Sequence, residues 1–296
     1  MGRSVWRRLT SYRRPRKLRR MSDNGEKSDM ELREREWNDD IVPDEMLEAN
    51  PRQAPDCIPE ISSLKSMESV SLLPGIRVQS SRQESGPGVV FVFEQASLVL
   101  ARVNKSYQIL NPDEHGGFMK KHNLDRRDYR PDIIHEVLKR LLGRPLNMTG
   151  RIQAVYVKTI QGYLIKIDPI TVIPPTLKLF CAMISQLFQK LSIKGSGRHK
   201  NRKLLQMIQN PVTMHLPAGS HKIGLSSTSS KAVDLGEYFD TISNDRTLVF
   251  VIGAMAHGKI DINYMDDFVA VSSLPLSARA CVSLICDALE WQQRIL

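Results

Sequence analysis

The chain has 296 residues, enough for one large domain or two ordinary ones, and 41% of them are hydrophobic. No apolar run reaches the ~18 residues that a membrane-spanning helix needs, so we expect no membrane span. The four cysteines, Cys57, Cys181, Cys281 and Cys286, show no Cys-x-x-Cys spacing, which favours reduced thiols of an intracellular protein over disulfides or a metal site.

Charge is distributed unevenly around the total of +10. Residues 1–20 contain nine Arg or Lys and no acid, residues 21–85 have a net charge of −8, and residues 86–296 have a net charge of +9. A basic folded part of this size suits a polyanionic partner such as RNA, although many soluble domains are equally basic.

Residues 1–85 form a predicted disordered extension, because they lack hydrophobic periodicity and are rich in charge, Ser and Pro. The run Arg13–Arg20 is typical of a nuclear or nucleolar address or of a nucleic-acid-binding arm. An Arg-rich, acid-free start is also typical of an organellar transit peptide. We prefer the nuclear interpretation, because arginines clustered around a proline make a poor amphipathic helix.

From Gly88 onward the pattern predicts a folded domain in which strands alternate with helices. In chain order we expect strands at 89–93 and 107–110, a helix at 132–142 that stops at Gly143, paired strands at 154–157 and 163–167, and a helix at 176–191. After this helix we expect a basic flexible loop at 194–202, a helix at 204–208, a strand at 222–225, a helix at 235–241, a strand at 247–252 and a helix at 278–290. Continuous apolar strands separated by helices are typical of a parallel sheet covered on both faces, which predicts the α/β class.

Two loops near the C-terminus carry the clearest functional signal, Val251–Lys259 and Val271–Ala278. The first follows the predicted strand at 247–252, and we expect a second short strand between the two loops; ligands of open α/β sheets bind at the carboxyl ends of strands. Gly253 and Gly258 would let the main chain approach a ligand closely, because neither has a Cβ atom. A lone Gly-x-x-x-x-Gly pair is usually only a turn, so the signal lies in the order of the two loops. Ser277 is better explained as the N-cap of the following helix than as a ligand contact.

In these loops the chain resembles the nucleolar essential protein family, the ribosome-biogenesis methyltransferases that act on N(1) of a pseudouridine in small-subunit ribosomal RNA. The resemblance runs from about Gly88 to Trp291. It also includes Tyr129–Ile133, Arg144–Asn147, Ile173–Pro174 and Asn210–Thr213. The family belongs to the SPOUT superfamily, so the resemblance implies that residues 86–296 form one α/β domain, a parallel sheet with a trefoil knot and helices on both faces.

The resemblance further implies S-adenosyl-L-methionine as the methyl donor. By this likeness the cofactor-binding residues are Leu225, Gly253, Gly258, Val271, Ser272, Ser273, Leu274, Pro275 and Leu276. Arg130 would contact the RNA and Asp132 would steady it, whereas the residues alone also allow a structural ion pair at a helix start. We assign no catalytic side chain, and His135-Glu136 lacks the second histidine of a zinc-protease motif, so we expect no metal.

The chain departs from the family at positions that are expected to contact the RNA. Three arginines that clamp the RNA backbone in the family are replaced by Val172, Pro175 and Leu179, and an aspartate near the target base is replaced by Gly143. Two functions therefore remain open: an active methyltransferase working as a homodimer on ribosomal RNA and the pre-ribosome in the nucleolus, or a non-catalytic copy acting as an RNA-binding ribosome-assembly factor. A methyltransferase with a different RNA target is a third possibility. The complete cofactor loops favour the first.

Overall fold

The computed structural model describes residues 88–226, 229, 232–242, 245–258, 260 and 263–295. The predicted disordered extension, its basic run and Cys57 lie outside these residues. Within the described part, no helix combines the length and the apolar character needed to cross a bilayer.

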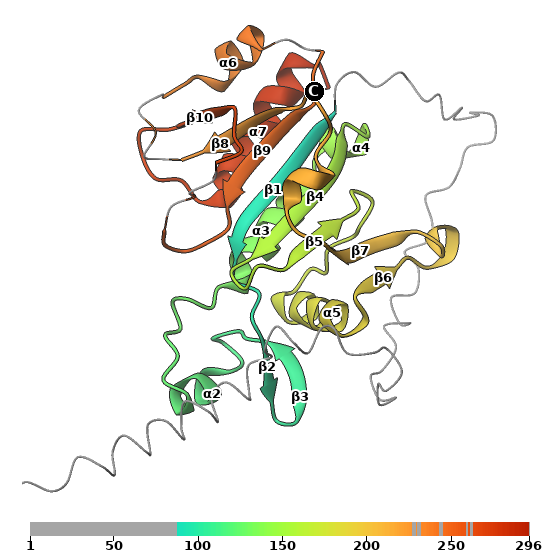
Figure 1. Cartoon of the computed structure of the whole chain (residues 1–296), viewed down its shortest axis with the longest axis vertical. Coiled ribbons are helices and arrows are strands. Elements are labelled where there is room, and N and C mark those ends of the chain that lie inside the picture. The colour runs from blue at the N-terminus through green and yellow to red at the C-terminus, as the bar shows by residue number, and fades with distance from the viewer. Residues whose placement is uncertain are drawn as a thin grey trace, which may run out of the picture. The chain divides into compact units, whose positions relative to one another are not determined.

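An eight-stranded sheet in the order β10-β8-β9-β1-β4-β5-β7-β6 organises the described domain (Figure 1). Its strands are β1 (Val89–Ala96), β4 (Ile152–Thr159), β5 (Leu164–Ile167), β6 (Ser192–Lys194), β7 (Lys203–Ile208), β8 (His221–Leu225), β9 (Leu248–Gly253) and β10 (Asp267–Val269). The five strands from β10 to β4 run parallel, and β5, β7 and β6 each run antiparallel to the next. β1 lies between β4 and β9, and its continuous apolar run suits a strand that is buried on both faces.

Helices pack on both faces of this sheet, the longer α-helices on one face and a short 3-10 helix on the other. The helices are α2 (Gly116–Lys121), α3 (Pro131–Leu142), α4 (Pro145–Met148), α5 (Leu177–Lys190), α6 (Leu235–Thr241), α7 (Ala278–Gln292) and the 3-10 helices η2 (Gly197–His199) and η3 (Val212–His215). The larger core joins α3, α5, α6 and α7 to one face, and the second core packs Val212 of η3 on the other. The hairpin β2 (Leu100–Val103) and β3 (Ser106–Ile109) packs with α2 in a small third core.

Most expected elements occur close to their predicted bounds, and the α/β class is confirmed. Thr176 caps α5 through its side chain, and Leu191 ends that helix in the left-handed conformation, with φ of 59°. Gly143 is the C-cap of α3, as expected, and it adopts an ordinary φ of −87°.

One expectation between α5 and η3 is wrong, and another is refined by the structure. Residues 204–208, expected as a helix, lie in β7, because the segment is long enough for one strand and pairs with both β5 and β6. Residues 194–202, expected as a flexible loop, form the end of the β6–β7 hairpin with the short helix η2. Backbone hydrogen bonds across the loop, such as Gly195 N to Arg202 O at 2.9 Å, fix this turn.

Candidate functional site

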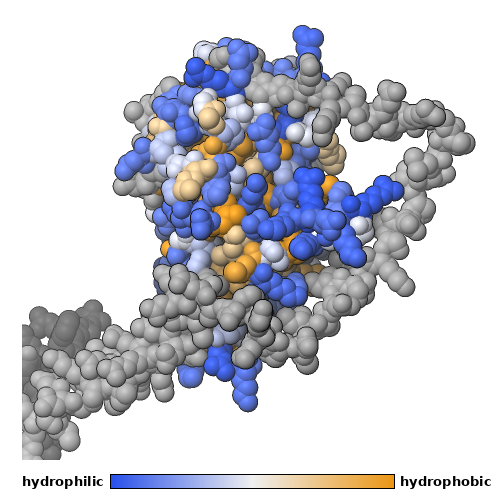
Figure 2. Space-filling view, turned by 45° about the vertical axis from the view of Figure 1, so that its right-hand side comes forward, coloured by the Kyte–Doolittle hydropathy of each residue, from blue (hydrophilic) through white to orange (hydrophobic). Residues whose placement is uncertain are grey.

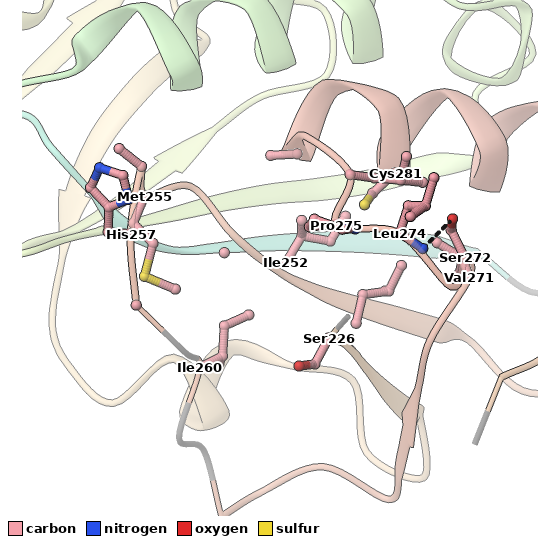
Figure 3. A pocket seen from close by; sticks show the side chains of 16 residues that line it. Ser226, Ile252, Met255, His257, Ile260, Val271, Ser272, Leu274, Pro275 and Cys281 are labelled. Carbon is pink, nitrogen blue, oxygen red and sulfur yellow. Dashed lines mark hydrogen bonds between the residues drawn. The ribbon is translucent and has the colours of Figure 1, made fainter. Parts of the chain in front are cut away.

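A pocket of about 220 Å³ opens at the carboxyl ends of β8, β9 and β10 and beside the start of α7 (Figure 3). Figure 3 shows the side chains of the loop after β9 and of the loop before α7 facing one another across it. The pocket is lined by Leu225, Ser226, Ile252, Gly253, Met255, Ala256, His257, Gly258, Ile260, Val271, Ser272, Leu274, Pro275, Leu276, Ala278 and Cys281. Eight of the nine residues predicted to bind the cofactor are among them, and only Ser273 is not.

The glycines of the first loop keep its backbone close to the pocket. Gly258 has a φ of +118°, a conformation that side-chain-bearing residues rarely adopt. A Cβ atom at Gly253 would lie 2.8 Å from the methyl carbon of Met255 and 3.3 Å from Cγ1 of Ile260. Larger residues at these two positions would therefore displace the pocket wall.

Glu94 and Tyr264 anchor the first loop to the sheet, and the sequence alone did not single them out. The Ala254 N–H donates to the carbonyl oxygen of Glu94 at 2.7 Å, and Glu94 pairs in register with Gly253. The buried carboxylate of Glu94 accepts from the Tyr264 hydroxyl at 3.3 Å and lies 3.5 Å from Lys158 Nζ. Burial, together with the nearby Glu94 carboxylate, raises the pKa of Tyr264, so this hydroxyl remains a donor at neutral pH.

The second loop ends at a regular helix N-cap. The side chain of Ser277 accepts from the Ala280 N–H at 3.2 Å, which confirms its predicted capping role, and it does not line the pocket. The Leu274 N–H donates to the Ser272 hydroxyl at 3.1 Å and shapes the turn. Cys281 lies in the first turn of α7 and faces the pocket, where burial raises the pKa of its thiol.

These features fit S-adenosylmethionine as the sequence predicts. Apolar side chains provide surfaces for an adenine ring, while the exposed main chain of both loops provides donors and acceptors for its edge and for an amino-acid moiety. The two glycines leave space where a Cβ atom would intrude.

Arg130 and Asp132 form a two-pronged ion pair at the start of α3. Nε and Nη2 of Arg130 donate to the two carboxylate oxygens of Asp132 at 2.8 and 2.7 Å, and this bonding raises the pKa of the guanidinium. The backbone N–H of Arg130 donates to the Ser97 hydroxyl at 3.2 Å, which ties the pair to the segment after β1. Both side chains are exposed, so the guanidinium is fixed in direction and open to a ligand.

The positions at which the chain departs from the family occupy the segment that leads into α5, the first turn of α5 and the end of α3. Val172 is 85% exposed and Leu179 is 43% exposed, so apolar side chains point outward where the family has arginines. Beside Gly143, Arg144 is drawn inward, where it bonds both Asp287 and the fully buried Glu290 of α7. Arg144 therefore stabilises the packing of α4 against α7.

Comparisons of the sequence with known proteins agree on one family. A family model described as EMG1/NEP1 methyltransferase matches residues 91–290. The ribosomal RNA small subunit methyltransferase NEP1 of Mus musculus is 37% identical over 215 residues, which cover 73% of this chain and 86% of the mouse protein. The ribosomal RNA small subunit methyltransferase nep-1 of Caenorhabditis elegans is 35% identical and matches 72% of this chain and 91% of its own length.

A solved structure shares the fold. The crystal structure of Archaeoglobus fulgidus Nep1 bound to S-adenosylhomocysteine matches with a TM-score of 0.54 and 21% sequence identity, covering 71% of this chain and 99% of the archaeal chain.

Proposed function

The chain belongs to the EMG1/NEP1 methyltransferase family, and from this membership we propose that it transfers the methyl group of S-adenosylmethionine to N(1) of a pseudouridine in small-subunit ribosomal RNA. The observation that carries the proposal is the assembly of eight predicted cofactor residues around one pocket. The relatives are named as small-subunit ribosomal RNA methyltransferases, and the archaeal Nep1 was crystallised with the demethylated cofactor.

The chemistry requires alignment more than side-chain catalysis. The cofactor, when bound, supplies an activated methyl group. The protein's part is to hold that methyl group in line with the acceptor nitrogen and to exclude competing water. The two loops, fixed by Glu94, Tyr264 and the Ser277 cap, are suited to this positioning.

Arg130 is the proposed contact for the RNA backbone. Asp132 occupies Nε and Nη2 of its guanidinium and leaves Nη1 directed away from the pair, suited to a phosphate oxygen. A fixed arginine loses less conformational entropy on binding than a mobile one.

A homodimer in the nucleolus, engaged with the pre-ribosome, completes the proposal. Leu284 and Trp291 are 40% and 80% exposed and lie seven residues apart on α7, so they share one face of this helix. An exposed apolar helix face supports self-association. Light scattering of the protein and of a Trp291→Glu variant tests the dimer, and fluorescence microscopy of the tagged full chain tests the location.

The activity is tested with labelled S-adenosylmethionine and a ribosomal RNA hairpin that carries either pseudouridine or uridine at the target. We expect N(1)-methylpseudouridine by nucleoside mass spectrometry with the first hairpin alone. Val172, Leu179 and Gly143 favour the second candidate function, a non-catalytic RNA-binding assembly factor. Cofactor and RNA binding without transfer to either hairpin would contradict methylation of this target and would support that function or a methyltransferase with a different RNA target.

A further inference from the structure

The end of the β6–β7 hairpin, residues 194–203, is an exposed segment rich in cations, and we refer to it as the basic tip. The segment from Lys190 to Lys203, with both ends included, has six Lys or Arg residues and no acid. The exposed cations of the tip itself are Lys194, Arg198, Lys200, Arg202 and Lys203. Figure 2 turns this side of the molecule forward and shows a large group of hydrophilic side chains there.

The backbone of the basic tip forms a hydrogen-bonded turn. The Gly195 N–H donates to the Arg202 carbonyl oxygen at 2.9 Å, and the Arg202 N–H donates to the His199 carbonyl oxygen at 2.8 Å. Gly197 adopts a φ of +55°, and a Cβ atom at Gly195 would lie 2.7 Å from the His199 carbonyl oxygen. The close approach makes glycine necessary at position 195, whereas the left-handed φ at position 197 only favours it.

The tip is also attached firmly to the rest of the domain. Nε of Arg202 donates to Asp168 at 2.6 Å, and the Thr171 hydroxyl donates to the Leu204 carbonyl oxygen at 3.1 Å. Asp168 is the one acid that the structure pairs with the tip; Lys194, Arg198, Lys200 and Lys203 form no ion pair with any described residue. Within the described residues, four cations of the tip are therefore left for an anion.

Protection of the sheet edge explains only part of this charge. Charged residues, Lys especially, discourage edge-to-edge pairing when they lie on the edge strand itself. On β6 only Lys194 occupies such a position. Arg198 and Lys200 lie in and just after η2, beyond the last strand pair, where no edge needs protection.

The basic tip lies far from the pocket. β6 and β10 are opposite edges of the sheet, and neighbouring strands are spaced by about 4.8 Å, so the two edges are separated by roughly 30 Å. The tip begins β7, which runs in the same direction as β4 because both are antiparallel to β5. It therefore lies at the amino ends of the parallel strands, whereas the pocket lies at their carboxyl ends.

We propose that the basic tip binds backbone phosphates of the ribosomal RNA at a segment distant from the methylated nucleotide. The inference rests on the proposed function, because the substrate of that function, ribosomal RNA, is a polyanion. An extended polyanion such as RNA is long enough to reach from the pocket to the opposite corner of the sheet. Clustered Arg and Lys supply the sequence-independent part of RNA affinity, which falls with salt as counterions are released.

The test uses the full chain, with Arg198→Gln/Lys200→Gln as the variant. Binding is measured from low to high salt with a short target hairpin and with a longer ribosomal RNA fragment that retains flanking sequence. For the long RNA we expect affinity to fall about tenfold at low salt and the slope of log affinity against log salt to flatten by about two units. For the short hairpin the variant and the unaltered protein should bind equally.

Two controls isolate the effect. Lys105→Gln/Lys121→Gln removes the same charge from the β2–β3 and α2 region and should leave long-RNA binding unchanged. Arg198→Lys/Lys200→Arg keeps the charge and should keep the affinity. Equal loss in the Lys105 and Lys121 variant would mean a diffuse charge effect and would overturn the inference.

The outcome for methyl transfer separates this inference from the proposed function. If the unaltered protein methylates RNA and the Arg198 and Lys200 variant binds long RNA normally, the tip assignment is wrong and the enzyme assignment stands. If the variant loses long-RNA affinity while no protein transfers methyl, the tip assignment stands and the activity fails. If the unaltered protein binds no ribosomal RNA, both fail, and an acidic protein becomes the better ligand for the tip.

Discussion

The hydroxyl of Tyr264 donates to the buried carboxylate of Glu94 across 3.3 Å and so joins the loop after β9 to the neighbouring strand β1. The two residues are 170 positions apart in the sequence. The wall of the candidate cofactor pocket thus depends on a contact that does not involve Gly253 or Gly258, the glycines by which the sequence identifies the pocket.

Tyr264→Phe should weaken cofactor binding about two- to tenfold, because one hydrogen bond with a net value of about 0.5–1.5 kcal/mol no longer restrains the loop. Calorimetric titration with S-adenosylhomocysteine measures the change. Tyr156→Phe is a matched control, since it loses a bond of 3.1 Å from its hydroxyl to the His215 carbonyl oxygen in η3, and neither residue lines the pocket. Equal losses in both variants would show that Tyr264 acts on global stability alone.

Gly253→Val and Gly258→Val should each abolish detectable cofactor binding. At Gly253 the branched side chain would collide with Met255 and Ile260, and at Gly258 it would meet a φ of +118° that it cannot readily adopt. Gly117→Val places the same side chain where nothing lies within 4 Å and serves as the control. Unchanged affinity in the Gly253 and Gly258 variants would remove both residues from the site.

Arg130→Ala should weaken RNA binding and leave affinity for the cofactor unchanged, because the guanidinium faces solvent next to Asp132 and does not line the pocket. Removing one phosphate contact should flatten the salt dependence by about one unit of slope. Filter binding across a salt series, paired with cofactor titration, measures both. A parallel loss of the two affinities would identify Arg130 as a structural residue.

Cys281 should react with iodoacetamide slowly at neutral pH and faster as pH rises, because burial raises the pKa of its thiol and only the thiolate is nucleophilic. Saturating S-adenosylhomocysteine should protect it, since it faces the pocket. Peptide mass spectrometry follows each cysteine separately. Cys286, whose pKa burial raises to about 12, is the internal control and should remain unmodified with or without ligand. Labelling of Cys281 at the same rate with ligand bound would place the cofactor elsewhere.

Glu290→Ala should lower the free energy of unfolding by about 3–5 kcal/mol, because it leaves Arg144 as a largely buried charge without its main partner. It also removes the acceptor for the Leu146 N–H, which donates to Glu290 at 3.0 Å. Asp287→Asn alters the exposed partner of the same arginine and should cost about 1 kcal/mol or less. Urea denaturation of both variants measures the difference, and similar costs would argue against a buried clamp.

The sequence was sufficient for most of the fold because its central strands carry their own signal. The apolar runs of β1 and β9 predict buried parallel strands without reference to any neighbour. β7 lacks such a signal: Lys203–Ile208 contains good helix formers, and its strand conformation comes from pairing with β5 and β6.

The candidate site likewise contains some residues that the sequence identifies and others that only the folded structure identifies. Gly253, Gly258 and the residues around Pro275 are recognisable because their types and order are distinctive. Glu94 and Tyr264 are an ordinary acid and an ordinary aromatic residue, and only the folded sheet brings them together. Arg144 likewise gives no sign in the sequence that its partners, Asp287 and Glu290, lie in the last helix.

The position of β1 has a consequence for synthesis of the protein. Val89 of this first described strand of the sheet pairs with Ile152 of β4 and with Leu248 of β9. During translation β1 therefore has at most one of its two neighbours until the ribosome has made residues 248–253, and such non-local pairing slows folding. During that interval the side of β1 that later pairs with β9 is exposed. This exposure carries a risk of aggregation, which chaperones on the nascent chain would reduce.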